Sequence, residues 1–456
     1  MTPKLTSFWS PTRQILDREI TRIPAPACDL QNGPKASFWQ LGSAKGEAIW
    51  AWVTAAFAIY WILFVTGAFL GRKELNAVGG VLVLGVLSCM ILERLWVRLD
   101  AVFIACFAAA IGIPLLQLIV LSEPISAEAL FKHISLCMVM AASRVLNLPV
   151  VCRSGVRWLL ALQVLLILLI SFTIFRGTSW DGGTRHSGLF VNPNNLALIP
   201  FLLLFLMDPL RDKKLVRLTI HAIVVAVLAF SGTTGAVLAY AIGLVVNYRK
   251  QIPKHYRTFV YTLIPLTAVV GVAFFAANGA SILPETRMTK QIEVIGGQLR
   301  NVLQGGDIAY YEQERVLGPG TASGIWRVAH WRRTVTAYLD GTPLEQLVGF
   351  GFGSSPRILG KLPHNEYLRT LFEQGILGLF LFIFAWRRII MTAPQQVRYI
   401  GLIVAIYSFS ENNLDNFPFM ALFILFLSAR DDTDSVAIRV PRRRSPMWNP
   451  VLRPAA

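Results

Sequence analysis

Long runs of apolar residues, separated by short polar segments, make up most of the chain from residue 48 onward. A helix needs about 20 such residues to cross the hydrocarbon core of a bilayer. Runs that approach or reach this length lie at about 48–70, 76–97, 101–121, 128–148, 157–176, 188–207, 216–230, 232–247, 257–277, 366–386, 397–410 and 416–429. Several are short enough to indicate tilted, kinked or partly re-entrant helices. The pattern predicts an all-α integral membrane protein with about twelve transmembrane helices.

The polar segments divide the chain into five regions. They are an N-terminal segment (1–47), a first set of nine transmembrane helices (48–277), a large loop expected to contain short helices (278–365), a last set of three helices (366–429) and a basic tail (430–456). The first region lacks the short apolar core and small-residue cleavage site of a signal peptide, so we expect the first span to stay in the protein.

Positive charge gives the expected orientation. The formal net charge is +17, although only 15% of the residues are charged. Lys and Arg residues are concentrated in alternate loops, with Arg72 and Lys73 as the main exceptions, and this bias marks the cytoplasmic side. Both termini are then cytoplasmic, and the loop 278–365 faces outward. Because topology accounts for the charge, no nucleic-acid partner is expected.

The five cysteines lie near the N-terminus or in and beside the apolar runs, so no disulfide framework is predicted. The sequence has no HExxH or CxxC motif and no clustered His and Asp spacing. We therefore expect neither a metal nor a cofactor.

The segment 362–368 joins the outer loop to an apolar helix and carries the first candidate catalytic residue, His364. Pro363 suits a helix entrance, and Asn365 is expected to accept a hydrogen bond from a first-turn amide. The unpaired amides and the helix dipole would form a seat for a phosphate oxygen. The same field disfavours an imidazolium, so we expect a neutral His364 that can accept a proton. The alternative is a histidine that only caps a helix at the membrane interface.

Two arginines are candidates for binding a diphosphate. Arg185 precedes an Asn192-Pro193 pair that is expected to cap and start the sixth span. Arg327 and Trp331 are four residues apart in a helical pattern, so they share a face. An arginine can grip phosphate through paired hydrogen bonds, while the ring stacks on a sugar. The alternatives are an arginine that reaches lipid headgroups and a helix that lies on the membrane surface.

Other polar residues fall on the same predicted outer face. Glu411 and Asp415 are carboxylates that could bind sugar hydroxyls or act as an alternative base, or could simply keep a loop soluble. Glu373 lies deep in the helix that follows His364, where an unpaired charge is costly, so we expect it to have a partner. The glycine-rich segment 349–353 has neither the flanking strand nor the Lys of a nucleotide loop, and we interpret it as a close-packed turn that positions Pro363 and His364.

Taken together, these motifs resemble those of the O-antigen ligase and Wzy-type polysaccharide polymerase superfamily. The resemblance covers roughly residues 180–385. It is carried by Arg185 with Gly188 and Asn192-Pro193-Asn194, the polar corner before Gly235, Arg327-x-x-x-Trp331, Gly349-Phe350-Gly351, and His364-Asn365-x-Tyr367-Leu368 through Glu373-Gln374-Gly375. Family members often have an arginine where this chain has Thr234, which leaves phosphate binding to Arg185 and Arg327.

The resemblance implies a GT-C-like glycosyltransferase in the bacterial inner membrane, with its active site facing the periplasm. The donor would be an oligosaccharide on undecaprenyl diphosphate, and neither metal nor nucleotide would be needed. His364 would take the acceptor proton, Arg185 and Arg327 would neutralise the leaving diphosphate, and the anomeric centre would be inverted. Candidates for sugar or acceptor contacts are Trp331, Asn365, Tyr367, Glu373 and Glu411.

Within the superfamily, we favour a polymerase of exopolysaccharide or O-antigen repeats, for which chain-length regulators and export proteins are the expected partners. The alternative is a ligase that transfers the glycan to lipid A-core. A more distant alternative is a lipid-linked sugar flippase or another transporter. Such proteins tend to have internal repeats and polar residues near the middle of the membrane. This chain has no clear repeat, and its polar residues gather at one rim.

Overall fold

The structure is a computed structural model that describes eight segments of the chain: residues 38–92, 101–121, 125–145, 155–175, 186–190, 192–206, 213–248 and 323–429. By its internal contacts the chain divides into two compact units, residues 1–43 and 44–456. Of the first unit, only the beginning of the first helix is described. All that follows concerns the second unit.

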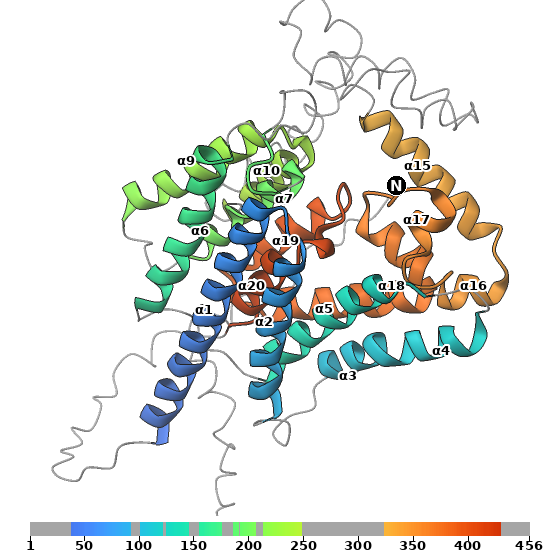
Figure 1. Ribbon diagram of the computed structural model, residues 1–456, viewed down its shortest axis with the longest axis horizontal. Helices are drawn as coiled ribbons and strands as arrows, with labels where there is room; N and C mark the ends of the chain where they lie inside the picture. The colour runs from blue at the N-terminus through green and yellow to red at the C-terminus, as the bar shows by residue number, and fades with distance from the viewer. Residues whose placement is uncertain are drawn as a thin grey trace, which may run out of the picture. The chain divides into compact units, whose positions relative to one another are not determined.

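Every regular element in the described residues is helical. The N-terminal elements are α1 (Phe38–Leu70), α2 (Glu74–Leu92), α3 (Ala101–Phe107), the π-helical turn η1 (Ala108–Gly112), α4 (Ile113–Val120), α5 (Ala127–Val145) and α6 (Gly155–Thr173) (Figure 1). They are followed by α7 (Pro193–Leu198), α8 (Phe201–Leu204), α9 (Lys214–Ser231) and α10 (Thr234–Tyr248). The C-terminal elements are α15 (Ser323–Leu339), α16 (Pro343–Val348), α17 (Ser354–Leu359), α18 (Glu366–Thr392), α19 (Arg398–Tyr407), the 3-10 turn η4 (Asn413–Asp415) and α20 (Phe417–Ser428).

Four of the described helices are long and apolar enough to cross a membrane: Ala48–Leu70 within α1, Ala101–Val120, α9 and α18. Six shorter apolar helices accompany them. Large hydrophobic side chains on these helices are exposed, among them Ile119, Leu215 and Phe380. An apolar surface of this extent is expected of a protein whose solvent is lipid, so the helices and their surface support a membrane protein.

The helices lie where the apolar runs predict them, except that the run 257–277 falls outside the described residues. The run 188–207 differs from a single span. It contains two short helices, α7 and α8, with a break at Ile199 and Pro200. The proline lacks the amide that would continue the helix, which explains the break. The described part of the loop 278–365 contains the three short helices α15, α16 and α17.

The core is centred on α20, whose residues from Pro418 to Ser428 are all buried. A helix that is apolar on every side is stable only inside a bundle. It packs on α5, α8 and α18. Phe426 stacks against Phe205 and Trp50, with ring centroids 5.3 and 5.4 Å apart, and Trp386 contacts Phe423 edge-on. The last helix is thus held by side chains from both halves of the chain.

Helix α18 is broken at Gly375, whose φ of 66° and ψ of −170° are not helical. The carbonyls that the break frees find other donors. The Phe350 amide donates to the Phe372 carbonyl at 2.9 Å, and the Gln117 side chain donates to the Glu373 carbonyl at 2.7 Å. Because a buried carbonyl without a donor is costly, these bonds make the break stable.

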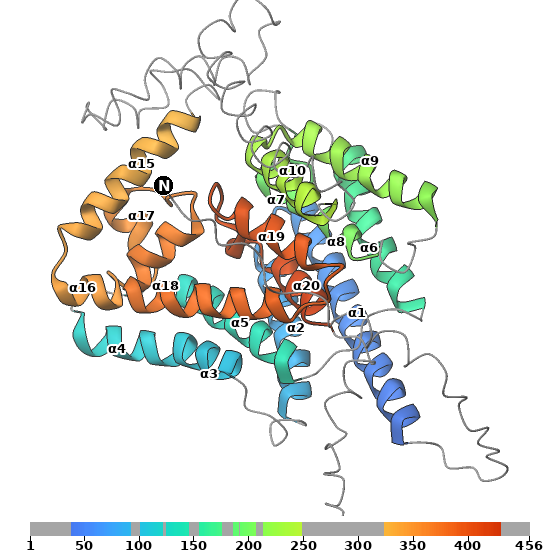
Figure 2. The ribbon, with the colours of Figure 1, turned by 180° about the vertical axis from the view of Figure 1, so that it is seen from behind.

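At the break, Gly349 and Gly375 each lie very close to backbone atoms of the opposite segment. A Cβ on Gly349 would lie 2.4 Å from the backbone of residues 373 and 374, and one on Gly375 would lie 2.3 Å from the Leu347 carbonyl oxygen. Close packing of the glycine-rich turn is therefore confirmed. The turn packs on the break in α18, and its expected role in positioning Pro363 and His364 stays a prediction. Figures 1 and 2 show α15, α16 and α17 grouped at the end of α18 where this turn lies.

Candidate active site

His364 immediately precedes the N-cap of α18. The side-chain oxygen of Asn365 accepts hydrogen bonds from the amides of Tyr367 and Leu368, both at 3.1 Å, so the predicted cap is confirmed. The Glu366 amide donates to the Ser408 carbonyl at 2.9 Å. The first-turn amides are therefore already occupied. For that reason, the prediction that these amides bind a phosphate oxygen is wrong.

The backbone of His364 is left-handed, with a φ of 48°. This conformation costs about 1–3 kcal/mol for a residue other than glycine and persists only where neighbours enforce it. Trp331 supplies one restraint, because its indole N–H donates to the Pro363 carbonyl at 2.7 Å. His330 supplies another through the Lys361 carbonyl at 3.1 Å. The ring of Trp326 meets the His364 ring edge-on at 5.4 Å.

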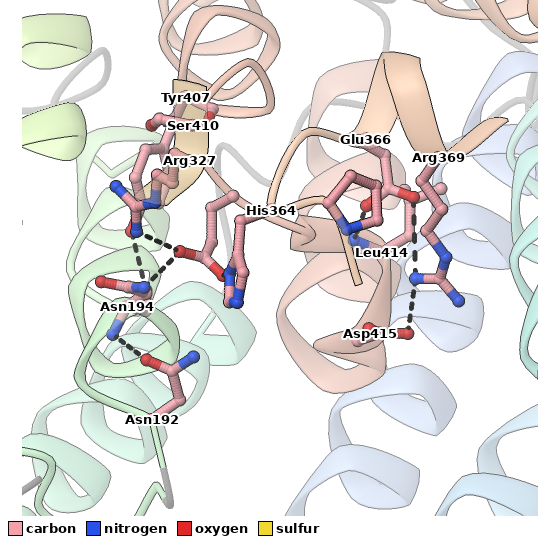
Figure 3. A network of polar contacts seen from close by, with 12 residues as sticks. Asn192, Asn194, Arg327, His364, Glu366, Arg369, Tyr407, Ser410, Leu414 and Asp415 are labelled. Carbon is pink, nitrogen blue, oxygen red and sulfur yellow. Dashed lines mark hydrogen bonds and ion pairs between the residues drawn. The ribbon is translucent and has the colours of Figure 1, made fainter. Parts of the chain in front are cut away.

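The carboxylate of Glu411 is the centre of the site, and Figure 3 shows its partners His364, Arg327 and Asn194. One oxygen lies 2.8 Å from Nδ1 of His364. The other accepts a hydrogen bond from the side-chain amide of Asn194 and lies 3.4 Å from a guanidinium nitrogen of Arg327. The Glu411 residue is only 3% exposed. A buried carboxylate is thus surrounded by three donors from three other segments. We refer to Glu411, His364, Arg327 and Asn194 as the Glu411 cluster.

These contacts fix the protonation pattern. Burial by itself would raise the pKa of Glu411, but the hydrogen bond from His364 and the positive charges of His364 and Arg327 outweigh it and lower that pKa below the ordinary value. An ionised carboxylate can only accept hydrogen bonds, so Nδ1 of His364 must carry the hydrogen. In a neutral imidazole, Nε2 then has the free lone pair. This is the arrangement of a general base oriented by a carboxylate.

The residues of the Glu411 cluster come from parts of the chain that are far apart in sequence. Asn192 caps α7 by accepting the Asn194 amide at 2.9 Å, which confirms the cap predicted for this residue. Tyr407 donates to the Asn194 carbonyl at 3.3 Å, so the end of α19 holds the start of α7. Glu411 itself lies in the segment 408–416 between α19 and α20, and Arg327 lies on α15.

The other candidates have contacts of their own. Arg185 lies outside the described residues, so its place in the site stays a prediction. Trp331 and Arg327 are on one helix as expected, but the indole N–H of Trp331 bonds the loop before His364. Tyr367 donates its hydroxyl to the Ala405 carbonyl at 2.9 Å and packs on Phe409. Sugar contacts by Trp331, Asn365 and Tyr367 stay predictions, beside the structural roles that these bonds assign.

A second group of charges lies next to the first and centres on Arg369 (Figure 3). Its guanidinium lies 2.9 Å from Asp415, 3.8 Å from Glu366 and 3.5 Å from Glu373. Glu373 thus has the partner expected for it, on its own helix rather than on another segment. Sequence reasoning did not single out Arg369 or Glu366. The signal available was that Glu366 lies three residues before Arg369 and Glu373 lies four residues after it, because residues at these spacings share a helix face.

The described residues contain no group of three or more His, Cys, Asp or Glu side chains placed to hold a metal ion. Chemistry without a metal stays a prediction. No family model matches the chain, and no curated protein matches it.

Proposed function

We propose that this chain is a periplasmic-face membrane glycosyltransferase of the O-antigen ligase and polysaccharide polymerase superfamily. It would polymerise oligosaccharide repeats carried on undecaprenyl diphosphate into an exopolysaccharide or O-antigen, as a multi-pass protein of the bacterial inner membrane. The observation that carries the proposal is the Glu411 cluster, in which a carboxylate orients a histidine beside an arginine at the entrance of an apolar helix.

In the proposed reaction, Nε2 of His364 accepts the proton of an acceptor hydroxyl. The electron pair left on the acceptor oxygen attacks the anomeric carbon of the donor, and the bond from that carbon to the diphosphate oxygen breaks. Glu411 stabilises the imidazolium that forms, because the carboxylate lies 2.8 Å from Nδ1. One displacement of this kind inverts the anomeric centre. The donor is already activated as a diphosphate ester, so the leaving group needs charge stabilisation rather than a proton.

Arg327 is the described residue suited to that stabilisation. It lies 3.4 Å from Glu411, its side chain is 20% exposed, and a guanidinium has five N–H donors. One carboxylate oxygen at that distance leaves donors for phosphate oxygens. We propose that Arg185 joins it from the segment before α7. We further propose about twelve membrane crossings with both termini in the cytoplasm, on the strength of the charge bias in the loops.

The test is reconstitution of the full chain in lipid with a defined undecaprenyl-diphosphate-linked repeat, followed by sizing of the products. The informative variant is His364→Asn, because asparagine tolerates a left-handed backbone but cannot act as a base. We expect a loss of about 10²- to 10⁴-fold in the transfer rate. The matched control is His221→Asn on α9, a histidine bonded to Tyr240 away from the cluster.

Products of increasing length from the repeat alone would support a polymerase. A single transfer that requires added lipid A-core would support the ligase alternative, which uses the same chemistry. Transfer that persists in His364→Asn would contradict the proposed base. In cells that carry His364→Asn, accumulation of lipid-linked repeats on the cytoplasmic side of the membrane would instead favour a flippase.

A further inference from the structure

The charges around Arg369 border a cleft between α5 and the first turns of α18. The space between the side chains amounts to about 20 Å³, room for about one water molecule, and part of it is open to solvent. It is lined by Ala129, Lys132, His133, Leu136, Phe352, Glu366, Arg369, Thr370, Glu373, Gln374, Leu414 and Asp415. The reaction proposed above uses none of these residues.

The cleft has more hydrogen-bond acceptors than donors. Glu366, Glu373 and Asp415 share the single guanidinium of Arg369. Lys132 also borders the cleft, but its ammonium lies 2.7 Å from the carboxylate of Glu128. Among the described residues, three carboxylates therefore face one guanidinium, and their acceptor oxygens outnumber its N–H donors.

One of these oxygens is identified directly. Oε1 of Glu373 is buried and has no hydrogen-bond partner in the described part of the chain, and the Glu373 residue is only 2% exposed. Leaving such an oxygen without a donor costs more than the bond itself contributes, and native proteins rarely do so. A ligand that donates a hydrogen bond to Oε1 would remove that cost.

The remaining walls of the cleft are polar on one side and aromatic on the other. Nε2 of His133 lies 3.0 Å from the Ala109 carbonyl, so it carries the hydrogen, and Nδ1 is an acceptor. The Gln374 amide lies 3.4 Å from that Nδ1. The ring of Phe352 lies against His133 with centroids 4.7 Å apart and supplies an apolar surface. Carboxylates and an amide beside an aromatic ring suit a guest with hydroxyls on an apolar frame.

We propose that this cleft binds hydroxyl groups of a sugar unit in the glycan substrate, with Glu373 Oε1 as an acceptor. The inference rests on the proposed function, which supplies the sugar. A sugar hydroxyl is a neutral hydrogen-bond donor about the size of the gap. It can therefore donate a hydrogen bond to Glu373 Oε1 without adding charge. Asp415 is four residues after Glu411, and Glu366 is two after His364. A sugar held here is therefore positioned by the same two segments that hold the Glu411 cluster.

The experiment measures sugar binding apart from transfer. The probe is the lipid-free oligosaccharide released by mild acid from the natural lipid carrier, titrated into the purified full chain by saturation-transfer NMR. Because it lacks the diphosphate, it is not a donor. We expect Glu373→Gln to weaken binding about ten- to hundredfold, the effect of losing a hydrogen bond to a charged group. The control is Glu74→Gln, the same change at an exposed side chain at the start of α2 and outside the cleft lining.

A second variant keeps the test decisive if Glu373→Gln fails to fold. Ala129 lines the cleft from a partly exposed position on α5, so Ala129→Leu narrows the cleft without removing any of the charges. Loss of binding in both variants, with binding by Glu74→Gln unchanged, supports the inference. Retention of wild-type binding in Ala129→Leu overturns it.

Two further measurements separate the alternatives. If sodium chloride raises the melting temperature of the wild type relative to choline chloride, and this rise is absent in Glu373→Gln, the cleft is a cation site and the inference is overturned. If the free oligosaccharide binds as expected but no transfer from the lipid-linked donor occurs, the cleft stands and the proposed function fails. If the wild type catalyses transfer, the KM values of Glu373→Gln show which sugar occupies the cleft. A raised KM for the acceptor indicates the acceptor sugar, and a raised KM for the donor indicates the donor sugar.

Discussion

At the scale of single residues, His364 meets two requirements at once. Its backbone is left-handed, and its ring is directed to Glu411. Local sequence indicated the helix start and the Asn365 cap, because a cap depends on residues within one turn. It did not indicate Glu411 as the orienting carboxylate, since that partner is 47 residues away and only the tertiary fold brings it close. We had expected the helix dipole to set the charge of His364, whereas a carboxylate is its nearest charged neighbour.

A first residue-scale prediction concerns the activity of Glu411→Gln. The amide keeps an oxygen near Nδ1 but has no charge with which to stabilise an imidazolium. We expect the transfer rate to fall by on the order of 10²-fold or more, with a smaller effect on the KM for the donor. The assay is the reconstituted transfer reaction, with Asp340→Asn on the exposed turn after α15 as the control. An unchanged rate would remove Glu411 from the mechanism.

A second residue-scale prediction concerns pH. The folded-state pKa of Glu411 is below its ordinary value of 4.5, so the unfolded chain binds the proton more readily. The resulting stabilisation is complete above about pH 4.5 and disappears as the pH falls through the folded-state pKa. We expect the melting temperature of the wild type to exceed that of Glu411→Gln at pH 7, and the gap to narrow below pH 4.5. A gap that is constant from pH 7 to pH 3 would contradict this assignment.

At the scale of elements, the break in α18 separates two environments within one helix. Before Gly375 the helix carries Glu366, Arg369 and Glu373, whereas from residue 376 to residue 383 the exposed side chains are all apolar, such as Phe380. The apolar run at 366–386 indicated the helix but not the break. A glycine inside a helical pattern is usually tolerated. What makes the break stable is the contact with Gly349 and the hydrogen bond from Gln117, both of which are tertiary.

The break leads to an element-scale prediction. In Gly375→Ala a Cβ would lie 2.3 Å from the Leu347 carbonyl oxygen, on a backbone with a φ of 66°. We expect a loss of about 2 kcal/mol or more in the free energy of unfolding. The control is Gly85→Ala in α2, where no described atom beyond the adjacent helix backbone and chain neighbours lies within 4 Å of the added Cβ. There we expect no loss, or a small gain, since alanine favours a helix. Thermal unfolding in detergent compares them, and equal melting temperatures would contradict the packing.

At the scale of the whole molecule, hydropathy predicted where the helices lie, because burial in lipid demands long apolar segments. It could not predict which helices meet. Helix α20 is buried on all sides and α9 exposes apolar side chains, yet both are apolar runs in the sequence. The same limit applies to the site, where Asn194 and Glu411 are 217 residues apart.

The proposed orientation gives a whole-molecule prediction. In a background without the five native cysteines, Asp340→Cys after α15 and Lys213→Cys before α9 place single thiols at exposed positions. We expect an impermeant maleimide to label position 340 in cells whose outer membrane alone has been opened, and position 213 only after the inner membrane is permeabilised as well. The reverse pattern would overturn the outward-facing site.

The position of Glu411 after its three partners in the sequence has a consequence for biosynthesis. A ribosome delivers His364, Arg327 and Asn194 before it delivers the carboxylate that binds all three. Until residue 411 has been made, His364 lacks the carboxylate that orients it, so we expect a nascent polypeptide to lack the proposed base. Under the proposed function, we expect lipid-linked glycan precursors to react only once the segment that carries Glu411 has been made and folded.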